Sequence, residues 1–307
     1  MNKQSNCTGL LIYFNKDYSK DIDSLYILIK SLCKVSSSIN KIYGMYSQSD
    51  KFTRTKKFNE KNLKELLEMA KKGTLDQISL EEKYSDIDLP IGINIEFGKR
   101  SYVPKIKAYK SHNLQIDLIT KKSSRLFENY LNLLKKKITD LDFQYGIAST
   151  ANNYLKLHEE LNASIYGFFD PKNPDAMFIK TEKEKRKEKE LIFYQNLDEY
   201  DKYIRRAYWA NFLNPTHVKK IGGIEKIKKE CPVFLVEELP GGNIYIQLTE
   251  KIEDFGTNKY YKKLKILDNF LKPIKHPDCP DPIFTSTNSS KQEQKAPSTT
   301  STLSAEK

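Results

Sequence analysis

Apolar residues recur with two different periods along the first half of the chain, and this alternation restricts the fold. Ile91–Phe97 has an apolar residue at every second position, the period of a half-buried strand. Asp21–Val35 and Asn59–Lys72 have apolar residues three and four positions apart, which predicts helices. Asn59 suits an N-cap and Gly73 follows the second helix. The same reasoning predicts strands at Thr8–Phe14, Asn40–Tyr46, Tyr102–Tyr109, Leu114–Ile119 and Phe143–Ala148, and a helix at Ser124–Leu141.

The second half of the chain mixes the same patterns with clear turn signals. Pro215 suits the start of a helix, and Gly222-Gly223 suits its end. Pro240-Gly241-Gly242 suits a hairpin loop. We expect, in chain order, helices at Leu197–Phe212, His217–Ile221 and Ile224–Glu230, a β-hairpin of Pro232–Leu239 and Asn243–Thr249, and a helix at Lys259–Leu271.

These patterns predict the α+β fold class, with one or more mostly antiparallel sheets and packed helices. Both parts of the chain share a loosely similar order of strands and helices, which is compatible with two similar α+β halves. Within 171–190, the run Thr181–Glu190 has no apolar residue, and the chain beyond Phe284 is rich in Pro, Ser and Thr. We therefore divide the chain into an N-terminal half (1–170), a charged insertion or linker (171–190), a C-terminal half with Trp209 and the hairpin (191–284), and a disordered tail (285–307).

The net charge of +12 requires an anionic partner to be considered. The basic residues are 46 Lys and only 6 Arg, whereas recognition of phosphate and guanine favours Arg. The stretch Lys105–Lys110 alternates Lys with Ile, Ala and Tyr, which suits an edge strand as well as a nucleic-acid contact. We interpret the charge as a general lysine bias that argues against nucleic acid. A basic nucleic-acid-binding accessory protein is the alternative function.

Three features favour a cytoplasmic protein without a membrane segment. No stretch approaches the ~18 consecutive apolar residues that a membrane helix needs, and the N-terminal residues lack a signal-peptide core. The cysteines are scattered, without metal-ligand or disulfide-framework spacing, which suits reduced thiols. They are Cys7, Cys33, Cys231 and Cys279.

The sequence contains no recognisable catalytic or cofactor motif. The nucleophile motif GxSxG and the phosphate-binding loop GxxxxGK[ST] are both missing. None of the histidines has zinc-site spacing. We therefore expect no enzyme activity, no cofactor and no metal, although a site assembled from distant residues, such as His158 or His217 beside a cysteine or carboxylate, stays open. The histidines are His112, His158, His217 and His276.

A specific pattern lies within Ala207–Glu250. It combines the aromatic pair in Ala207–Pro215, the Gly-bounded helix start at Ile221–Ile224, the apolar strand Val233–Leu239, and the Gly-turned strand Gly241–Glu250. In these features the chain resembles the immunity protein 52 family of bacterial polymorphic toxin systems, with type VI secretion immunity proteins as a near relative. The resemblance implies a cytoplasmic antidote that binds a cognate toxin domain, including nuclease-like toxins, and neutralises it stoichiometrically.

An inhibitor of this kind needs a rigid scaffold and a complementary surface rather than reactive groups. Interfaces depend on a few aromatic or Arg anchors with polar rims, so Tyr208 and Trp209 are candidate partner contacts. Packing beneath the hairpin is the other interpretation of these two aromatic residues. Acidic residues gather around the hairpin and are candidates for a patch facing a basic toxin. They are Glu237, Glu238, Glu250, Glu253 and Asp254.

Overall fold

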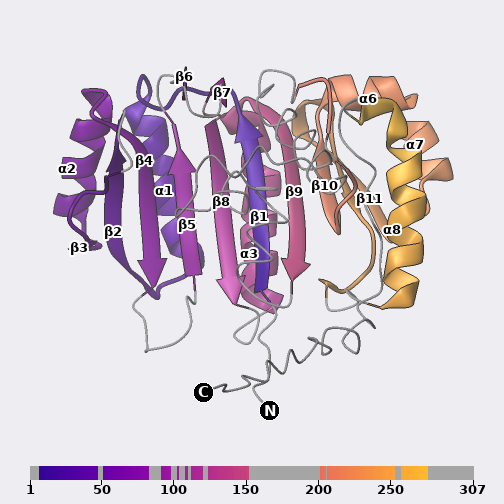
Figure 1. Ribbon diagram of the computed structural model, residues 1–307, viewed down its shortest axis with the longest axis horizontal. Helices are drawn as coiled ribbons and strands as arrows, with labels where there is room; N and C mark the ends of the chain where they lie inside the picture. Colours follow the sequence, from indigo (N-terminus) through magenta and orange to yellow (C-terminus); the bar gives the residue numbers. More distant parts are fainter. Residues whose placement is uncertain are drawn as a thin grey trace, which may run out of the picture.

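The structure is a computed structural model of the 307-residue chain. It describes residues 7–47, 51–82, 91–97, 102–103, 108–109, 112–119, 124–151, 201–204, 206–252 and 257–275. Within these residues, ten strands form one antiparallel sheet in the order β11-β12-β10-β9-β1-β8-β5-β4-β2-β3 (Figure 1). The α+β prediction is confirmed. The sheet strands are β1 (Cys7–Phe14), β2 (Ile39–Tyr46), β3 (Lys56–Lys57), β4 (Leu75–Glu82), β5 (Ile91–Glu96), β8 (His112–Ile119), β9 (Phe143–Ala151), β10 (Ala210–Leu213), β11 (Leu235–Leu239) and β12 (Asn243–Gln247).

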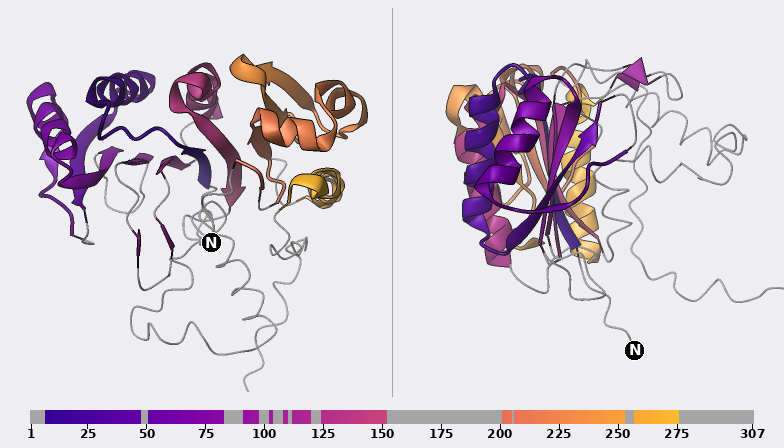
Figure 2. Two further views of the ribbon diagram at one scale, coloured as in Figure 1. Left: turned by 90° about the horizontal axis from the view of Figure 1, so that it is seen from above. Right: turned by 90° about the vertical axis from the view of Figure 1, so that its left-hand side faces the viewer.

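Three long helices cover one face of this sheet. They are α1 (Ile22–Val35), α2 (Glu60–Lys71) and α3 (Ser124–Lys137), and α3 continues into the 3-10 helix η2 (Ile138–Leu141). Figure 2 shows α1 between α2 and α3 on this face, and α8 (Asn258–Phe270) on the opposite face at the far end of the sheet. The remaining described helices are the short α6 (Pro215–Ile221) and α7 (Ile224–Glu230) and the 3-10 helices η5 (Pro240–Gly242) and η7 (Lys272–Ile274).

The core lies between the sheet and the helix layer. Antiparallel register places Ile12, Gly146, Phe212 and Tyr245 in one row across four neighbouring strands. A Cβ atom on Gly146 would lie only 2.4 Å from Ile12 Cδ1 and 3.2 Å from Phe212 Cδ2. Glycine at this position therefore lets two large side chains meet over the strand between them. The helices complete the core with leucines at three-and-four spacing, including Leu25, Leu28 and Leu32 of α1 and Leu63, Leu66 and Leu67 of α2.

The predicted helix ends are confirmed where the sequence carries cap residues. Asn59 caps α2, because its side chain accepts a hydrogen bond from the Asn62 backbone N–H. Gly73 follows with a positive φ of 70°, and Asp21 caps α1 through the Ser24 N–H. The predicted start at Pro215 is also correct, since α6 begins there.

Two parts of the sheet in the first half differ from the predictions. Residues Leu75–Glu82, for which no strand was predicted, form β4 between β2 and β5. Of the strand predicted at Tyr102–Tyr109, the structure describes only the two ends, and these do not pair with β5. They contribute β6 (Tyr102–Val103) and β7 (Ala108–Tyr109), which pair with each other in a separate two-stranded sheet. The neighbours of β5 are therefore β4 and β8.

The helix predicted at Leu197–Phe212 is wrong in its described part. Ala210–Leu213 is instead a fully buried strand, β10, between β9 and β12. Because β9 precedes and β10 follows the predicted linker, strands from both sides of that boundary join in one sheet. The β11–β12 hairpin closes through the predicted Pro240-Gly241-Gly242 loop.

Several expectations lie outside the described residues. They concern the charged run Thr181–Glu190 and the tail 285–307. Among the described helices, none is long and apolar enough to cross a membrane.

Candidate functional site

The predicted aromatic anchors lie in the core. Tyr208 and Trp209 are 3% and 4% exposed. The Trp209 indole N–H donates to Thr249 Oγ1 at 3.1 Å, and its ring lies 5.9 Å from that of Phe127 on α3. The Tyr208 backbone exchanges two hydrogen bonds with the side-chain amide of Asn211. Both aromatic residues therefore pack in the described core beside β10, as the packing interpretation expects. Contact of either residue with a partner stays a prediction.

Glu237 and Glu238, two of the predicted acidic residues, pair with lysines of different helices. Glu237 pairs with Lys135 of α3 at 2.6 Å, and the Lys135 ammonium also lies 3.7 Å from the centre of the Tyr245 ring. Glu238, the next residue on β11, pairs with Lys228 of α7 instead. Successive strand residues point to opposite faces, so the two carboxylates lie on opposite faces of β11.

Glu250 is exposed after β12, whereas Glu253 and Asp254 lie outside the described residues. A partner contact by any of these acids stays a prediction.

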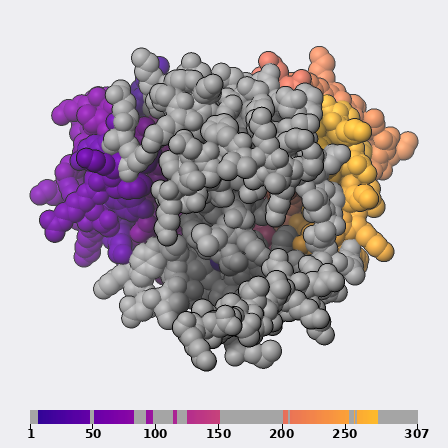
Figure 3. Space-filling model, in the orientation of Figure 1, coloured from indigo at the N-terminus to yellow at the C-terminus, as the bar shows by residue number. Residues whose placement is uncertain are grey.

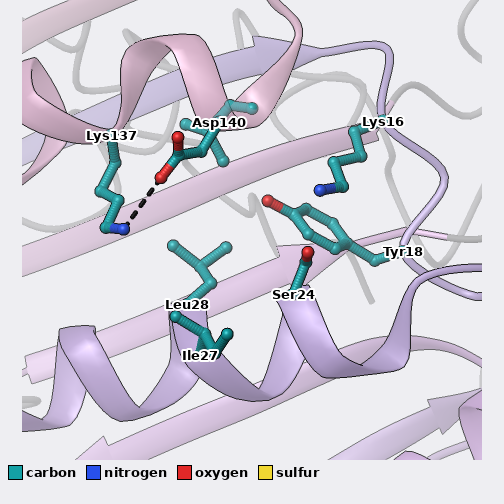
Figure 4. Close-up of a pocket in the computed structure, with 8 residues that line it drawn as sticks. Lys16, Tyr18, Ser24, Ile27, Leu28, Lys137 and Asp140 are labelled. Carbon is teal, nitrogen blue, oxygen red and sulfur yellow. Dashed lines mark hydrogen bonds and ion pairs between the residues drawn. The ribbon is translucent and has the colours of Figure 1, made fainter.

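A cavity that the sequence did not indicate lies between α1 and η2 (Figure 4). Its volume is about 270 Å³. Leu28, Leu141 and the half-exposed Ile27 give it an apolar side, and Tyr18 projects into it. Its lining residues are far apart in sequence, so no local motif could have revealed it. They are Lys16, Tyr18, Ser24, Ile27, Leu28, Lys137, Asp140 and Leu141.

The charged groups of this cavity are compensated in pairs. Lys16 pairs with Asp21 at 2.9 Å and Lys137 pairs with Asp140 at 2.8 Å. Hydrogen bonding to Lys16, followed by hydrogen bonds from Ser24, lowers the pKa of Asp21 to about 2. Burial raises the pKa of Tyr18, and Asp140 and Asp21 add to this effect. Tyr18 is therefore a neutral hydrogen-bonding group at physiological pH, and the cavity suits a neutral side chain better than an ion.

The sheet face opposite the three long helices carries polar side chains on β2, β4, β5 and β8. Register places Tyr43, Ser79, Asn94 and Gln115 in one row. Ser79 donates to Asn94 Oδ1 at 2.7 Å, and the Gln77 amide donates to Ser79 at 2.9 Å. Such alternation of apolar and polar residues is typical of antiparallel strands whose two faces meet different surroundings. We call this the polar sheet face, formed by Tyr43, Gln77, Ser79, Glu81, Asn94 and Gln115.

Of the four histidines in the sequence, His217 is the one whose side chain the structure describes, and it has a structural role. Its backbone N–H donates to the Asn214 side chain at 2.9 Å, and its Nδ1 accepts from the Asn214 backbone N–H at 3.4 Å. This reciprocal pair is the capping box of α6. The imidazole is fully buried against Tyr145, and burial lowers its pKa to about 3. It is therefore neutral and held in place by the helix cap.

The thiols of Cys33 and Cys231 are in their unreactive form. Burial raises the pKa of each to about 12, so neither is a thiolate at neutral pH. Cys7 is buried in β1, and Cys279 lies outside the described residues. Within the described part of the chain, no three His, Cys, Asp or Glu side chains gather as metal ligands would.

Comparison with known proteins gives a similarity of fold. No family model and no curated protein matches the sequence. The structure is similar to that of the Pseudomonas aeruginosa T6SS protein PA0821, with a TM-score of 0.55 and 14% sequence identity, over 88% of this chain and 73% of that chain. At this identity the likeness shows a shared fold.

A second solved structure is much less similar. It is the toxic C-terminal tip of CdiA from Pseudomonas aeruginosa in complex with its immune protein. The identity is 10%, the alignment covers 47% of this chain and 85% of that chain, and the TM-score is 0.25. This value is too low to indicate a common fold.

Proposed function

We propose that this chain is an immunity protein, which binds a cognate bacterial toxin effector and neutralises it by forming a stoichiometric complex. The observation that carries the proposal is the fold shared with a T6SS protein over most of both chains. The residue patterns of Ala207–Glu250 point to the same class of protein, and in their finer form to the immunity protein 52 family.

The chemistry of the described residues supports binding rather than catalysis. The two half-buried thiols are protonated, and the His217 ring is enclosed in the cap of α6. General acid–base work requires a titratable group that reaches its substrate and has a pKa near the working pH. His217 meets neither condition. The structure offers instead a continuous sheet braced by helices, which suits a rigid binding surface.

Protection of cells from the neighbouring gene product tests this function. The protein encoded next to this chain is expressed in a bacterial host, with this chain on a second inducible plasmid. We expect growth to stop with the neighbour alone and to recover when both are expressed. Equal killing with and without this chain would remove the proposal.

The nucleic-acid alternative is tested separately. Many described lysines have carboxylate partners, as in Lys30–Glu60, Lys56–Glu65 and Lys228–Glu238, so they are less available to phosphates. We expect no retention of a short DNA or RNA duplex by the purified chain at low salt. Binding that weakens steeply as salt rises would favour the alternative.

A further inference from the structure

The exposed side of α8 is a basic surface. Helical periodicity places its buried residues, including Leu264, Leu267 and Leu271, on one side and its lysines on the other. Ile266 lies among the lysines and is 53% exposed. The gold atoms of α8 form part of the front surface of the molecule (Figure 3). We call this surface the α8 lysine face, formed by Lys259, Lys262, Lys263, Lys265 and Ile266.

The lysines of this face have no acidic partner among the described residues. Elsewhere Lys30, Lys137 and Lys228 form ion pairs with nearby carboxylates. The one acid in α8, Asp268, is buried and accepts hydrogen bonds from the Ala207 N–H at 2.8 Å and from Lys275 at 2.7 Å. Its charge is therefore compensated inside the fold, and the α8 lysine face keeps its full positive charge.

The order of charges along α8 also conflicts with helix stability. The N-terminus of a helix has a partial positive charge, which favours acidic side chains in the first turn and basic ones in the last. Helices α1, α2 and α7 follow this rule with Asp23, Glu60 and Glu225 in their first turns and lysines in their last turns. Helix α8 has Lys259 and no acid in its first turn, and no basic residue in its last. Local conflicts of this kind concentrate at functional surfaces.

We propose that the α8 lysine face binds an acidic surface of the partner protein, an inference that rests on the proposed immunity function. Charge complementarity selects an acidic occupant, since α8 presents no exposed carboxylate. Ile266 supplies the apolar contact that the centre of a protein interface contains. Helix α8 has lysine but no arginine, and phosphate recognition favours arginine, so an acidic protein fits better than a nucleic acid. The toxin surface that this chain covers is therefore acidic.

Matched charge removal on two helices tests the inference. One variant combines Lys259→Gln, Lys262→Gln and Lys265→Gln on α8. The control removes the same charge from three exposed lysines of α2 at the other end of the sheet. The control substitutions are Lys61→Gln, Lys64→Gln and Lys71→Gln.

The association rate with the purified neighbouring gene product is measured at about 50 mM and about 500 mM salt. We expect the α8 variant to associate about tenfold more slowly than wild type at low salt and to lose most of the salt dependence. The α2 control should keep the wild-type rate. Equal rates for the two variants would overturn the inference and leave the proposed function intact.

A second arm separates protein from nucleic acid. Ile266→Ala is compared with Phe52→Ala, because both side chains are about half exposed, at 53% and 54%. We expect only Ile266→Ala to weaken the complex, by a few-fold or more. No effect of Ile266→Ala would argue against a protein interface centred on this residue.

A partner-free measurement covers failure of the proposed function. If the wild-type chain does not bind the neighbouring gene product, the proposed immunity function is wrong. Binding of poly-glutamate and of a short DNA duplex then shows whether the α8 lysine face prefers an acidic protein or a nucleic acid. Poly-glutamate binding that the α8 variant loses and the α2 control keeps would support an acidic protein partner. Tighter binding of DNA through the same lysines, or no α8-dependent binding of either probe, would overturn it.

Discussion

His217 shows how a residue type associated with catalysis can serve the fold alone. It closes the capping box of α6 with Asn214 and packs its ring edge against Tyr145. Enclosure removes the water that would stabilise the imidazolium form, so burial holds the pKa at about 3, below the ordinary value of 6.5.

This burial predicts acid sensitivity with a definite sign. Below pH 6.5 the unfolded chain takes up a proton at His217 that the folded chain does not bind until about pH 3. Stability is therefore complete above about pH 7 and falls as the pH drops from about 6.5 toward 3, by roughly 1.4 kcal/mol per pH unit. His217→Gln keeps a capping acceptor that does not titrate. Urea unfolding between pH 7.5 and pH 4.5 should show a flatter dependence for the variant, and identical slopes would contradict this account.

A second prediction concerns Gly146 in the core row of β9. An added Cβ would lie 2.4 Å from Ile12 Cδ1, so Gly146→Ala requires the core row to move. We expect a loss of about 1–3 kcal/mol in unfolding free energy, as for other overpacked cores. Gly92→Ala on β5 is the control, since no heavy atom lies within 4 Å of its added Cβ. Thermal unfolding of both variants measures the difference, and equal stabilities would show that the row adapts freely.

Among the elements, α8 has the charge order least suited to its own stability. Lys259 lies in the first turn, near the partial positive charge of the helix N-terminus. Lys259→Glu should therefore stabilise the protein by about 0.3–1 kcal/mol. It should also weaken partner binding if the α8 lysine face is the docking surface. Thermal unfolding and binding measured on the same preparation check both effects, with Lys265→Glu in mid-helix as the control for charge alone. If Lys259→Glu stabilises the protein and its partner binding stays at the wild-type level, then the lysine in the first turn of α8 has no role in binding.

Local patterns predicted the elements whose residues carry their own signals. The stripe and N-cap of α2 and the Gly-turned hairpin of β11 and β12 depend on neighbours in sequence, so the sequence was sufficient. The strand β4 contains Asp76, a residue type that is depleted in strands, and its alternation of polar and apolar residues is short, from Gln77 to Glu81. It forms because β2 and β5 pair with it on both sides. Tertiary pairing also converts Ala210–Leu213 from a helical pattern into β10.

The candidate site was less predictable than the fold. Trp209 was predicted as a candidate contact because aromatic residues anchor interfaces, but aromatic character does not distinguish a core position from a surface one. Glu237 and Glu238 are adjacent in sequence, yet strand alternation and the lysines of α3 and α7 separate their side chains. The α8 lysine face depends on which other lysines find partners, and that requires the structure.

At the scale of the molecule, one sheet unites both halves of the chain, with three long helices on one face and α8 on the other (Figure 2). The net charge of +12 is unusual for an inhibitor of a nuclease, because such an inhibitor covers a basic cleft. An acidic toxin surface docked on α8 removes this difficulty. The half-buried, protonated thiols of Cys33 and Cys231 are consistent with the proposed inhibitor, which acts by occupancy.

Titration of toxin activity with this chain tests that claim most directly. Purified neighbouring gene product is held at a fixed concentration well above the dissociation constant, and its activity is measured as this chain is added. We expect a linear fall that ends at one molar equivalent, with a one-to-one complex in solution. Loss of activity at a small fraction of an equivalent would indicate catalytic inactivation, and unchanged activity at excess would show no antidote function. Either result would contradict a stoichiometric immunity protein.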